Sequence, residues 1–196
     1  MKILFALFSY LFGSIPTGYL LYLKINKRDI RNFGSRSIGA TNLLRLTDKK
    51  TALLAALFDV IKGFIPVFLC LELFDDLFFS LICGFLAVFG HCFPIYIKFK
   101  GGKGVATTVG VYLALSLPSL LILVLVFVAI IMITKYVSLG SLVSVMTLPF
   151  TALIFGYDKF IIYFGILIFI LIAFQHRENI KRLIQGKERK LGEKEA

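Results

Sequence analysis

Six long apolar runs occupy most of this sequence and restrict what it can fold into. They cover residues 3–23, 52–71, 77–97, 105–133, 137–155 and 159–174. Most of them have about 20 residues, the length that a helix needs to cross the roughly 30 Å hydrocarbon core of a bilayer. Hydrophobic residues make up 59% of the chain and charged residues only 17%, which excludes an ordinary soluble globular domain. We therefore predict an all-α integral membrane protein, with residues 1–196 forming a single membrane domain.

The fourth run is too long for one ordinary span. As a single straight helix, residues 105–133 would extend about 43 Å. Pro118 lies in its middle, where a proline either breaks a helix or opens a new one. One long tilted span and two shorter spans are both compatible with this pattern. Splitting the run predicts a bundle of seven transmembrane helices, at approximately 3–23, 52–71, 77–97, 105–116, 118–134, 137–155 and 159–174.

The distribution of charge favours the seven-span count. The chain carries 22 Lys and Arg residues against 11 Asp and Glu residues, a formal net charge of +11. The basic residues gather in segments 24–50, 98–104 and 134–137 and in the tail after residue 176, and short cytoplasmic loops collect Lys and Arg. Seven spans place all these segments on one side, whereas six would separate the tail from the first loop. We therefore expect the N-terminus outside and the C-terminus in the cytoplasm.

The cysteines carry no signal of metal or disulfide chemistry. All three lie inside apolar runs, without the spacing of a metal site: Cys70, Cys83 and Cys92. We interpret them as small buried hydrophobic residues, and we expect neither a metal nor a cofactor.

The first polar segment that a helix bundle does not require is residues 31–45. Its Gly, Ser and Asn residues are typical of a tight loop whose backbone N–H groups, beside arginine, bind anions. An ordinary basic loop that touches anionic lipid headgroups is the alternative. Headgroup attraction requires only charge, so it does not account for the small polar side chains here. The candidate site residues in this segment are Ser35, Thr41, Asn42 and Arg45.

The second polar segment is residues 90–108. Gly101, Gly102 and Gly104 surround Lys103 immediately before an apolar run, so the backbone can approach a phosphate while the helix N-terminus and the lysine attract it. The spacing is not that of a Walker A loop, and a flexible turn explains the glycines equally well. Thr107 follows in the first turn of the expected helix and is a further candidate.

The third polar segment is residues 176–188. At helical spacing His176, Asn179 and Leu183 share one face, and Gly186 is placed to cap the C-terminal end of this expected helix. The alternative is a basic amphipathic tail on anionic lipid, which we prefer for four residues: Lys181, Arg182, Lys187 and Lys190. His176 and Asn179 are the candidate site residues.

One charged pair lies inside an apolar run. Asp59 and Lys62 are three residues apart, on one helical turn, so they can neutralise each other. Charge within the membrane is costly and points to function by default. A structural pair that fixes helix packing fits equally well, and the sequence leaves both interpretations open.

The three polar segments resemble the three cytoplasmic motifs of the bacterial acyl-phosphate:glycerol-3-phosphate acyltransferases, the PlsY family. The matching pieces are Gly34-Ser35, Gly39 to Asn42 and Arg45; then Gly90-His91, Pro94 and residues 99–107; then His176 to Ile180, Arg182-Leu183 and Gly186 to Glu188. Two further matches are Gly13 to Pro16 and Asp59-x-x-Lys62-Gly63. One departure is Arg36-Ser37, where the family usually has Gly-Asn.

This resemblance implies a function. Members of the family transfer a fatty acyl group from acyl phosphate to the 1-hydroxyl of glycerol 3-phosphate, which releases phosphate and forms lysophosphatidate in phospholipid biosynthesis. It also implies a multi-pass protein of the bacterial cytoplasmic (inner) membrane, with its active site at the cytoplasmic face. Glycerol 3-phosphate, acyl phosphate and membrane lipid are the expected partners, and no nucleic acid is expected.

We assign hypothetical roles on this basis. Residues 101–104 would hold the phosphate of glycerol 3-phosphate, with Thr41, Asn42 and Thr107 as further substrate-binding residues. Ser35 and Arg45 would orient acyl phosphate, while His176 and Asn179 position the attacking hydroxyl. Whether His176 or a substrate phosphate takes the proton stays open. The rival from another class is a small transporter or flippase for phosphorylated metabolites, which the short acidic outer loops disfavour.

Overall fold

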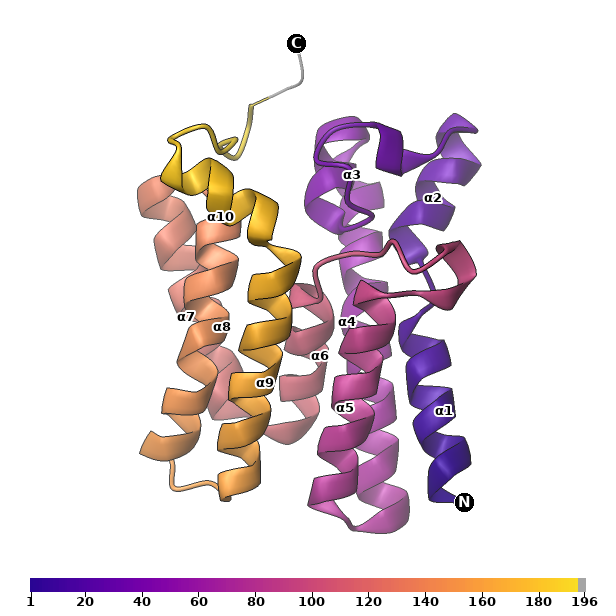
Figure 1. The fold of residues 1–196 in the computed structure, drawn as a ribbon, viewed down its shortest axis with the longest axis vertical. Coiled ribbons are helices and arrows are strands. Elements are labelled where there is room, and N and C mark those ends of the chain that lie inside the picture. Colours follow the sequence, from indigo (N-terminus) through magenta and orange to yellow (C-terminus); the bar gives the residue numbers. More distant parts are fainter. Residues whose placement is uncertain (194–196) are drawn as a thin grey trace. The chain divides into compact units, whose positions relative to one another are not determined.

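The computed structural model describes residues 1–193, and in this part of the chain every regular element is a helix (Figure 1). The predicted all-α class is therefore confirmed, while residues 194–196 of the predicted domain lie outside the described residues. The elements are α1 Lys2–Gly13, α2 Thr17–Asn26, η1 Ile30–Asn32, α3 Ala40–Leu46, α4 Lys49–Phe74, α5 Leu77–Cys92, η2 Ile95–Ile97, α6 Val105–Leu115, α7 Leu117–Thr134, α8 Val137–Ile154, α9 Lys159–Gln175 and α10 Arg177–Ile184.

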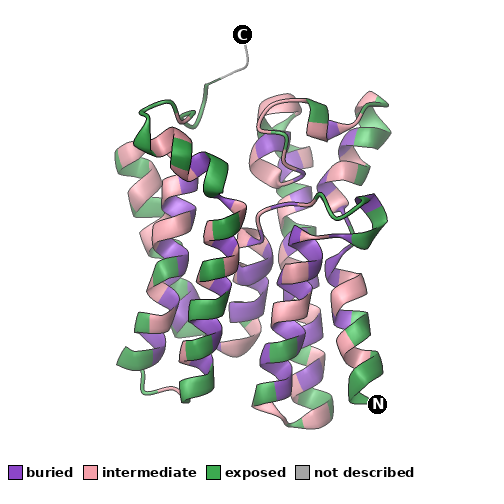
Figure 2. Cartoon of the chain, in the orientation of Figure 1, coloured by how far each residue is buried: buried purple, intermediate pink, exposed green. Residues whose placement is uncertain are grey.

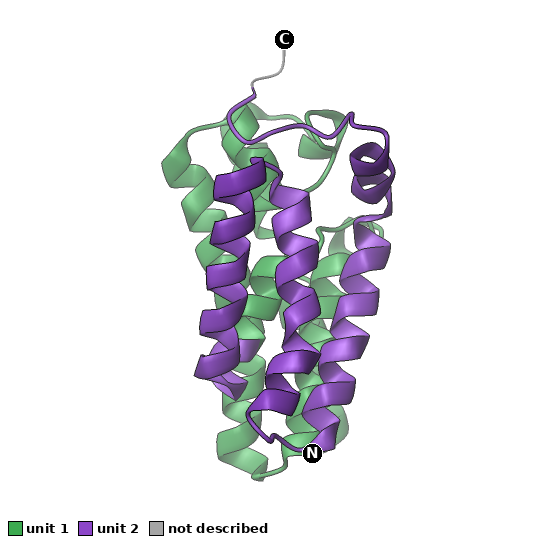
Figure 3. Cartoon of the chain, turned by 90° about the vertical axis from the view of Figure 1, so that its left-hand side faces the viewer, with its two compact units in different colours: residues 1–111, 194–196 green, residues 112–193 purple. Residues whose placement is uncertain are grey.

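The described chain divides into two compact units, residues 1–111 and 112–193 (Figure 3). In the first unit α1 and α4 both pack along α5, and the short α3 packs on α4 beside α2. In the second unit α8 lies between α7 and α9, and α10 contacts both α8 and α9. The polar segments 31–45 and 90–108 belong to the first unit, and segment 176–188 belongs to the second.

Several helices are long and apolar enough to cross a membrane. Within the described residues these are Lys2–Asn26, Lys49–Phe74, Leu77–Ile97, Leu117–Thr134 and Val137–Ile154. Helices α9 and α10, which meet at a bend of 68°, would together form a sixth, whereas α6 is shorter. The protein is thus a multi-pass membrane protein, and the exact number of crossings and the orientation of its termini stay predictions.

The long run at 105–133 contains a helix break, which lies just before Pro118. Helix α6 ends at Leu115, and the Ser116 side chain caps α7 by accepting a hydrogen bond of 3.2 Å from the Ser119 amide. Pro118 stands in the first turn of α7, where backbone N–H groups have no acceptor within the helix, so the missing N–H of proline costs no helical hydrogen bond. The proline therefore opens a helix here.

The first apolar run also contains a break, which its hydropathy does not reveal. Helix α1 ends at Gly13 and α2 begins at Thr17, with Pro16 between them. A Cβ on Gly13 would overlap the backbone of Ala87, so α1 approaches α5 closely at this point. Because proline lacks an N–H donor, the chain turns here and leaves carbonyl groups for other partners.

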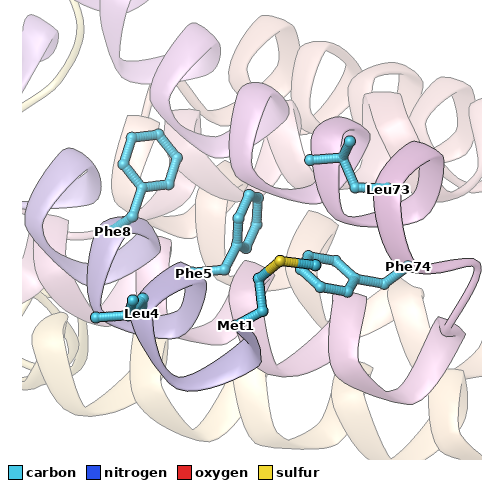
Figure 4. Close-up of a pocket in the computed structure, with 6 residues that line it drawn as sticks. All are labelled: Met1, Leu4, Phe5, Phe8, Leu73 and Phe74. Carbon is cyan, nitrogen blue, oxygen red and sulfur yellow. The ribbon is translucent and has the colours of Figure 1, made fainter.

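Many residues on the helices are exposed (Figure 2), and large apolar side chains are among them. On α7, for example, Leu125 and Ile133 are exposed by 67% and 79%. An apolar pocket of about 370 Å³ also opens at one end of the first unit (Figure 4), lined by Met1, Leu4, Phe5, Phe8, Leu73 and Phe74. It lies at the C-terminal end of α4, opposite the end that follows segment 31–45. Since its lining contains no polar side chain, it is not a candidate for phosphate chemistry.

Candidate functional site

Asn42 organises the loop of segment 31–45. Its side chain is buried, with Oδ1 accepting a hydrogen bond of 2.8 Å from the Ser35 amide and Nδ2 donating to the carbonyls of Phe33 and Ser37. Gly34 has φ +59°, and a Cβ there would overlap Asn42 Oδ1. The structure therefore uses the Asn42 amide to shape the loop that presents Ser35.

Helix α3 carries the other candidates of this segment. It begins after Gly39, and Thr41 and Arg45 are one turn apart on the same helical face. Both side chains are partly exposed, whereas Asn42 between them points into the loop. The structure thus brings Ser35, Thr41, Asn42 and Arg45 together in one short loop and helix.

Arg31 connects this loop to segment 90–108. Its guanidinium forms an ion pair of 2.7 Å with Asp29 and donates a hydrogen bond of 2.8 Å to the Ile97 carbonyl in η2. The hydrogen bonds from Arg31 hold the pKa of the Asp29 carboxyl below its usual range. A buried apolar cluster joins the same elements: Tyr22, Ile30, Ile38, Leu43, Ala52, Ala55 and Ile97. Both polar segments of the first unit are therefore fixed to one another.

The glycine loop, residues 101–104, rests on the end of α5. The amide of Gly101 donates to the Cys92 carbonyl at 3.2 Å, and that of Gly102 donates to the His91 carbonyl at 3.0 Å. A Cβ on Gly101 would overlap the His91 carbonyl, and one on Gly102 would overlap the His91 imidazole. These two glycines are thus required for close contact, so the loop is more than a flexible turn. Lys103 stands between Gly102 and Gly104, and it is partly exposed.

Helix α6 begins directly after this loop. Gly104 has φ +85°, and its carbonyl accepts the first helical hydrogen bond from the Thr108 amide at 2.8 Å. Thr107 and Thr108 are fully buried, and their hydroxyl oxygens have no hydrogen-bond partner among the described residues. Because the peptide dipoles of a helix are aligned, the N-terminal end of α6 carries partial positive charge, and it lies beside the glycine loop.

The second unit contains a different polar group around Glu188. Its carboxylate accepts hydrogen bonds from Asn179 Nδ2 at 2.6 Å, Ser138 Oγ at 2.8 Å and Arg182 Nε at 2.7 Å. The chain reaches this position because Gly186, with φ +66°, turns it back after α10. Burial raises the pKa of Glu188, but these hydrogen bonds outweigh it and leave the pKa below the usual range.

His176 lies at the bend between α9 and α10. It is 2% exposed, and its Nδ1 lies 2.8 Å from the Ile172 carbonyl. Because a carbonyl oxygen only accepts, this contact assigns the proton of the neutral ring to Nδ1 and makes Nε2 the acceptor atom. Asn179, one turn later on α10, is held through Glu188.

Sequence reasoning missed three residues that the structure makes important. Arg31 and His91 lie inside the polar segments but received no site role, and Glu188 was not singled out. Arg182, expected to face lipid, instead pairs with Glu188. The nine-residue separation of Asn179 and Glu188 has no helical period, so only the turn at Gly186 explains it.

Together these features define a class of protein: a multi-pass helical membrane protein with basic polar loop segments, one of which is a glycine loop. Residues 3–186 match the sequence model of the family described as "Glycerol-3-phosphate acyltransferase". The chain belongs to this family and is an acyltransferase. This assignment confirms the resemblance seen in the sequence, and it does not favour the transporter alternative.

Similar proteins cover nearly the whole chain. The "Glycerol-3-phosphate acyltransferase" of Endomicrobium trichonymphae is 41% identical, over 97% of this chain and 96% of its own length. "Glycerol-3-phosphate acyltransferase 2" of Thermotoga maritima is 40% identical, over 96% and 95%. A crystal structure of PlsY (YgiH), an integral membrane glycerol 3-phosphate acyltransferase in its glycerol 3-phosphate form, has a TM-score of 0.93 at 38% identity, covering 97% of this chain and 96% of that one. Its lysophosphatidic acid form has a TM-score of 0.90 at 36% identity, covering 97% and 95%.

Proposed function

We propose that this protein transfers a fatty acyl group from acyl phosphate to the 1-hydroxyl of glycerol 3-phosphate, forming lysophosphatidate and phosphate. The observation that carries the proposal is the glycine loop beside Lys103, fixed to the end of α5 by two backbone hydrogen bonds. The family assignment supports it, and the similar crystal structures are described as glycerol 3-phosphate and lysophosphatidic acid forms, an acceptor and a product of this reaction.

The reaction requires little from the protein beyond orientation and charge. The hydroxyl oxygen of glycerol 3-phosphate attacks the acyl carbonyl carbon, the bond from that carbon to the phosphate oxygen breaks, and phosphate leaves with the electron pair. Because acyl phosphate is already activated, aligned substrates and stabilisation of the departing charge are sufficient. Neither histidine begins a His-x-x-x-x-Asp dyad, since Tyr96 follows His91 and Lys181 follows His176 at that spacing.

Residues of the first unit would bind the phosphate groups. The loop of residues 101–104 binds the phosphate of glycerol 3-phosphate through the cation of Lys103, helped by the N-terminal end of α6 at Thr107. The Gly101 and Gly102 amides donate to the end of α5 and hold the loop in place. Ser35 and Arg45 orient acyl phosphate and stabilise the leaving phosphate, with Thr41 on the same face of α3. Asn42 contributes by holding the loop at Ser35 rather than by its own free amide.

In the second unit, His176 and Asn179 position the attacking hydroxyl. The assignment of Nε2 as the acceptor atom of His176 suits a hydrogen bond from a hydroxyl group. The hydroxyl proton goes either to this nitrogen or to a substrate phosphate. His176→Gln distinguishes the two, because loss of a general base lowers kcat by about 10²–10⁴-fold. A smaller fall assigns the proton to the substrate phosphate.

The protein would lie in the bacterial cytoplasmic membrane with seven spans, its N-terminus outside and its C-terminus and active site at the cytoplasmic face. The basic segments support this arrangement, because it places them on one side. Reporter fusions after Ser116 and Phe155 test it. Both positions should report the outer side, and cytoplasmic signals at both would contradict the seven-span count.

The donor is tested with purified protein. Glycerol 3-phosphate is supplied with acyl phosphate, acyl-CoA or acyl carrier protein in turn, and lysophosphatidate and released phosphate are measured. We expect product only with acyl phosphate, with one phosphate released for each lysophosphatidate. Product from thioesters but not from acyl phosphate would overturn the donor assignment.

A further inference from the structure

Asp59 and Lys62 form a buried ion pair on α4 that the proposed reaction does not use. The Asp59 carboxylate and the Lys62 ammonium are 2.8 Å apart, and the two residues are 2% and 3% exposed. Two apolar residues would fill such a position at no cost in desolvation, and replacing a buried ion pair in this way is often neutral or stabilising. The pair is therefore poorly explained by stability alone.

The partners of the pair lead toward the glycine loop. Asp59 Oδ1 lies 3.5 Å from Nδ1 of the buried His91 imidazole. Nε2 of the same ring is the atom that a Cβ on Gly102 would overlap. Asp59 thus contacts one edge of the ring, and the glycine loop rests against the other edge.

The loop is also attached to His91 through the backbone. The His91 carbonyl accepts from the Gly102 amide, and the next carbonyl accepts from the Gly101 amide. A rotation of the His91 ring or a shift at the end of α5 would therefore move both amides of the loop.

Lys62 has a second partner besides Asp59, and its neighbour on α4 contacts α6. Its ammonium donates a hydrogen bond of 2.9 Å to the Ile15 carbonyl, which lies at the break between α1 and α2. The neighbouring Gly63 lies so close to α6 that a Cβ would overlap the Thr107 carbonyl, and a Cβ on Gly110 would overlap the Val60 carbonyl. This part of α4 therefore contacts the helix that follows the loop as well as the histidine that precedes it.

We infer that Asp59 and His91 are positioning residues, which hold the glycine loop in the geometry that binds the phosphate of glycerol 3-phosphate, with Lys62 as the counter-ion that neutralises Asp59. The inference rests on the proposed function of that loop. It requires the cluster to act on the acceptor substrate, because its contacts lead to residues 101–104 and 107. A pair that only stabilised the bundle would affect both substrates equally.

Two double variants test the inference, with KM for each substrate and kcat as the readouts. Asp59→Leu with Lys62→Met removes both charges, so no unpaired charge is left buried, but it also removes the oxygen beside His91. Asp59→Asn with Lys62→Met removes the same charges and keeps that oxygen. We expect the first to raise KM for glycerol 3-phosphate at least tenfold, with KM for acyl phosphate and kcat within threefold. The second should keep KM for glycerol 3-phosphate, KM for acyl phosphate and kcat within threefold of wild type.

Three further variants serve as references. Ser80→Ala removes a buried hydroxyl of α5 that donates to the Asp76 carbonyl, far along the helix from His91, and should change neither KM. His91→Gln removes the ring beneath Gly102 and should reproduce the leucine-containing variant. Lys103→Met perturbs the glycine loop itself and should raise KM for glycerol 3-phosphate.

The outcomes separate the inference from the proposed function. Equal KM values for glycerol 3-phosphate in the two double variants would overturn the inference. Parallel rises in KM for glycerol 3-phosphate and KM for acyl phosphate would also overturn it. If Lys103→Met raises KM for glycerol 3-phosphate while neither His91→Gln nor the leucine-containing variant does so, only the positioning role fails. An unchanged KM in Lys103→Met would overturn the phosphate-binding loop, and the positioning inference with it.

Discussion

The glycine loop of the first unit and the Glu188 group of the second unit hold their polar atoms in different ways. In the glycine loop the hydrogen bonds join backbone amides to backbone carbonyls, and two glycines allow the contact with His91. Around Glu188, in the turn after α10, one carboxylate collects three side-chain donors from α8 and α10. The first arrangement is sensitive to added volume, and the second is sensitive to charge. Substitutions that add a Cβ should therefore affect the glycine loop, and substitutions that remove a charge should affect the Glu188 group.

The largest effect is expected from Gly102→Ala. The new Cβ would overlap the His91 imidazole, so the loop must move and its amides lose their alignment. We expect kcat/KM for glycerol 3-phosphate to fall about 100-fold, which corresponds to about 2.7 kcal/mol. Steady-state kinetics measure this. Gly156→Ala is the control, because it adds the same Cβ where no atom lies within 4 Å; its φ of +64° means that it tests backbone strain without a collision. Wild-type kinetics for Gly102→Ala would show that close packing of the loop is not required.

Glu188→Ala is expected to act on stability. It leaves the donors of Asn179, Ser138 and Arg182 without their shared acceptor, which costs about 2 kcal/mol in the free energy of unfolding. For a chain of this size, the melting temperature should fall by roughly 4–8 °C. A thermal unfolding scan of the purified protein in detergent measures it. An unchanged melting temperature would show that the hydrogen bonds to Glu188 do not stabilise the second unit.

Arg182→Met should have a smaller effect. The Arg182 side chain is 37% exposed, so its ion pair with Glu188 contributes about 1 kcal/mol or less. The neighbouring Lys181 is exposed, and Lys181→Met removes the same charge without touching Glu188. The two variants should therefore differ in melting temperature by a few degrees, measured in parallel. Equal melting temperatures would indicate that Arg182 belongs to the lipid-facing tail, as the sequence suggested.

The smallest effect is a dependence of stability on pH. The pKa of Glu188 in the folded protein is below the ordinary value of 4.5, so the carboxylate stabilises the fold above that pH. This contribution is lost as the pH falls through the folded-state pKa. Comparing the melting temperatures of wild type and Glu188→Gln from pH 7 to pH 3 measures it. The difference between them should narrow in acid, and a difference that widens would contradict the lowered pKa.

Hydropathy alone predicted the main helices. Each apolar run is helical in the structure, because a chain in lipid must satisfy its backbone hydrogen bonds within itself. The break at Ser116 was also visible, since Pro118 marks it. The break between Gly13 and Thr17 was not recognised because residues 14–16 do not interrupt the apolar run strongly. Gly13, at the end of α1, also lies in close contact with α5, which a hydropathy pattern does not contain.

The sequence indicated which polar segments to consider, but not the contacts that their residues make. Asn42 was expected to bind substrate, yet its amide makes three hydrogen bonds within its own loop. Arg31 and Glu188 depend on partners 66 and 50 residues away, Ile97 and Ser138, and no local spacing predicts such contacts. Asp59 and Lys62 were recognisable as a pair from their helical spacing. Their contacts with His91 and Ile15 required the folded chain.

The central claim is that residues 101–104 hold the phosphate of glycerol 3-phosphate, and calorimetric titration of the purified protein with this substrate tests it most directly. Lys103→Met is compared with Lys50→Met, which removes the same charge from an exposed position at the start of α4. We predict that Lys103→Met raises the dissociation constant for glycerol 3-phosphate at least tenfold, while Lys50→Met leaves it within twofold of wild type. Equal dissociation constants for Lys103→Met and wild type, with both proteins folded, would contradict the account.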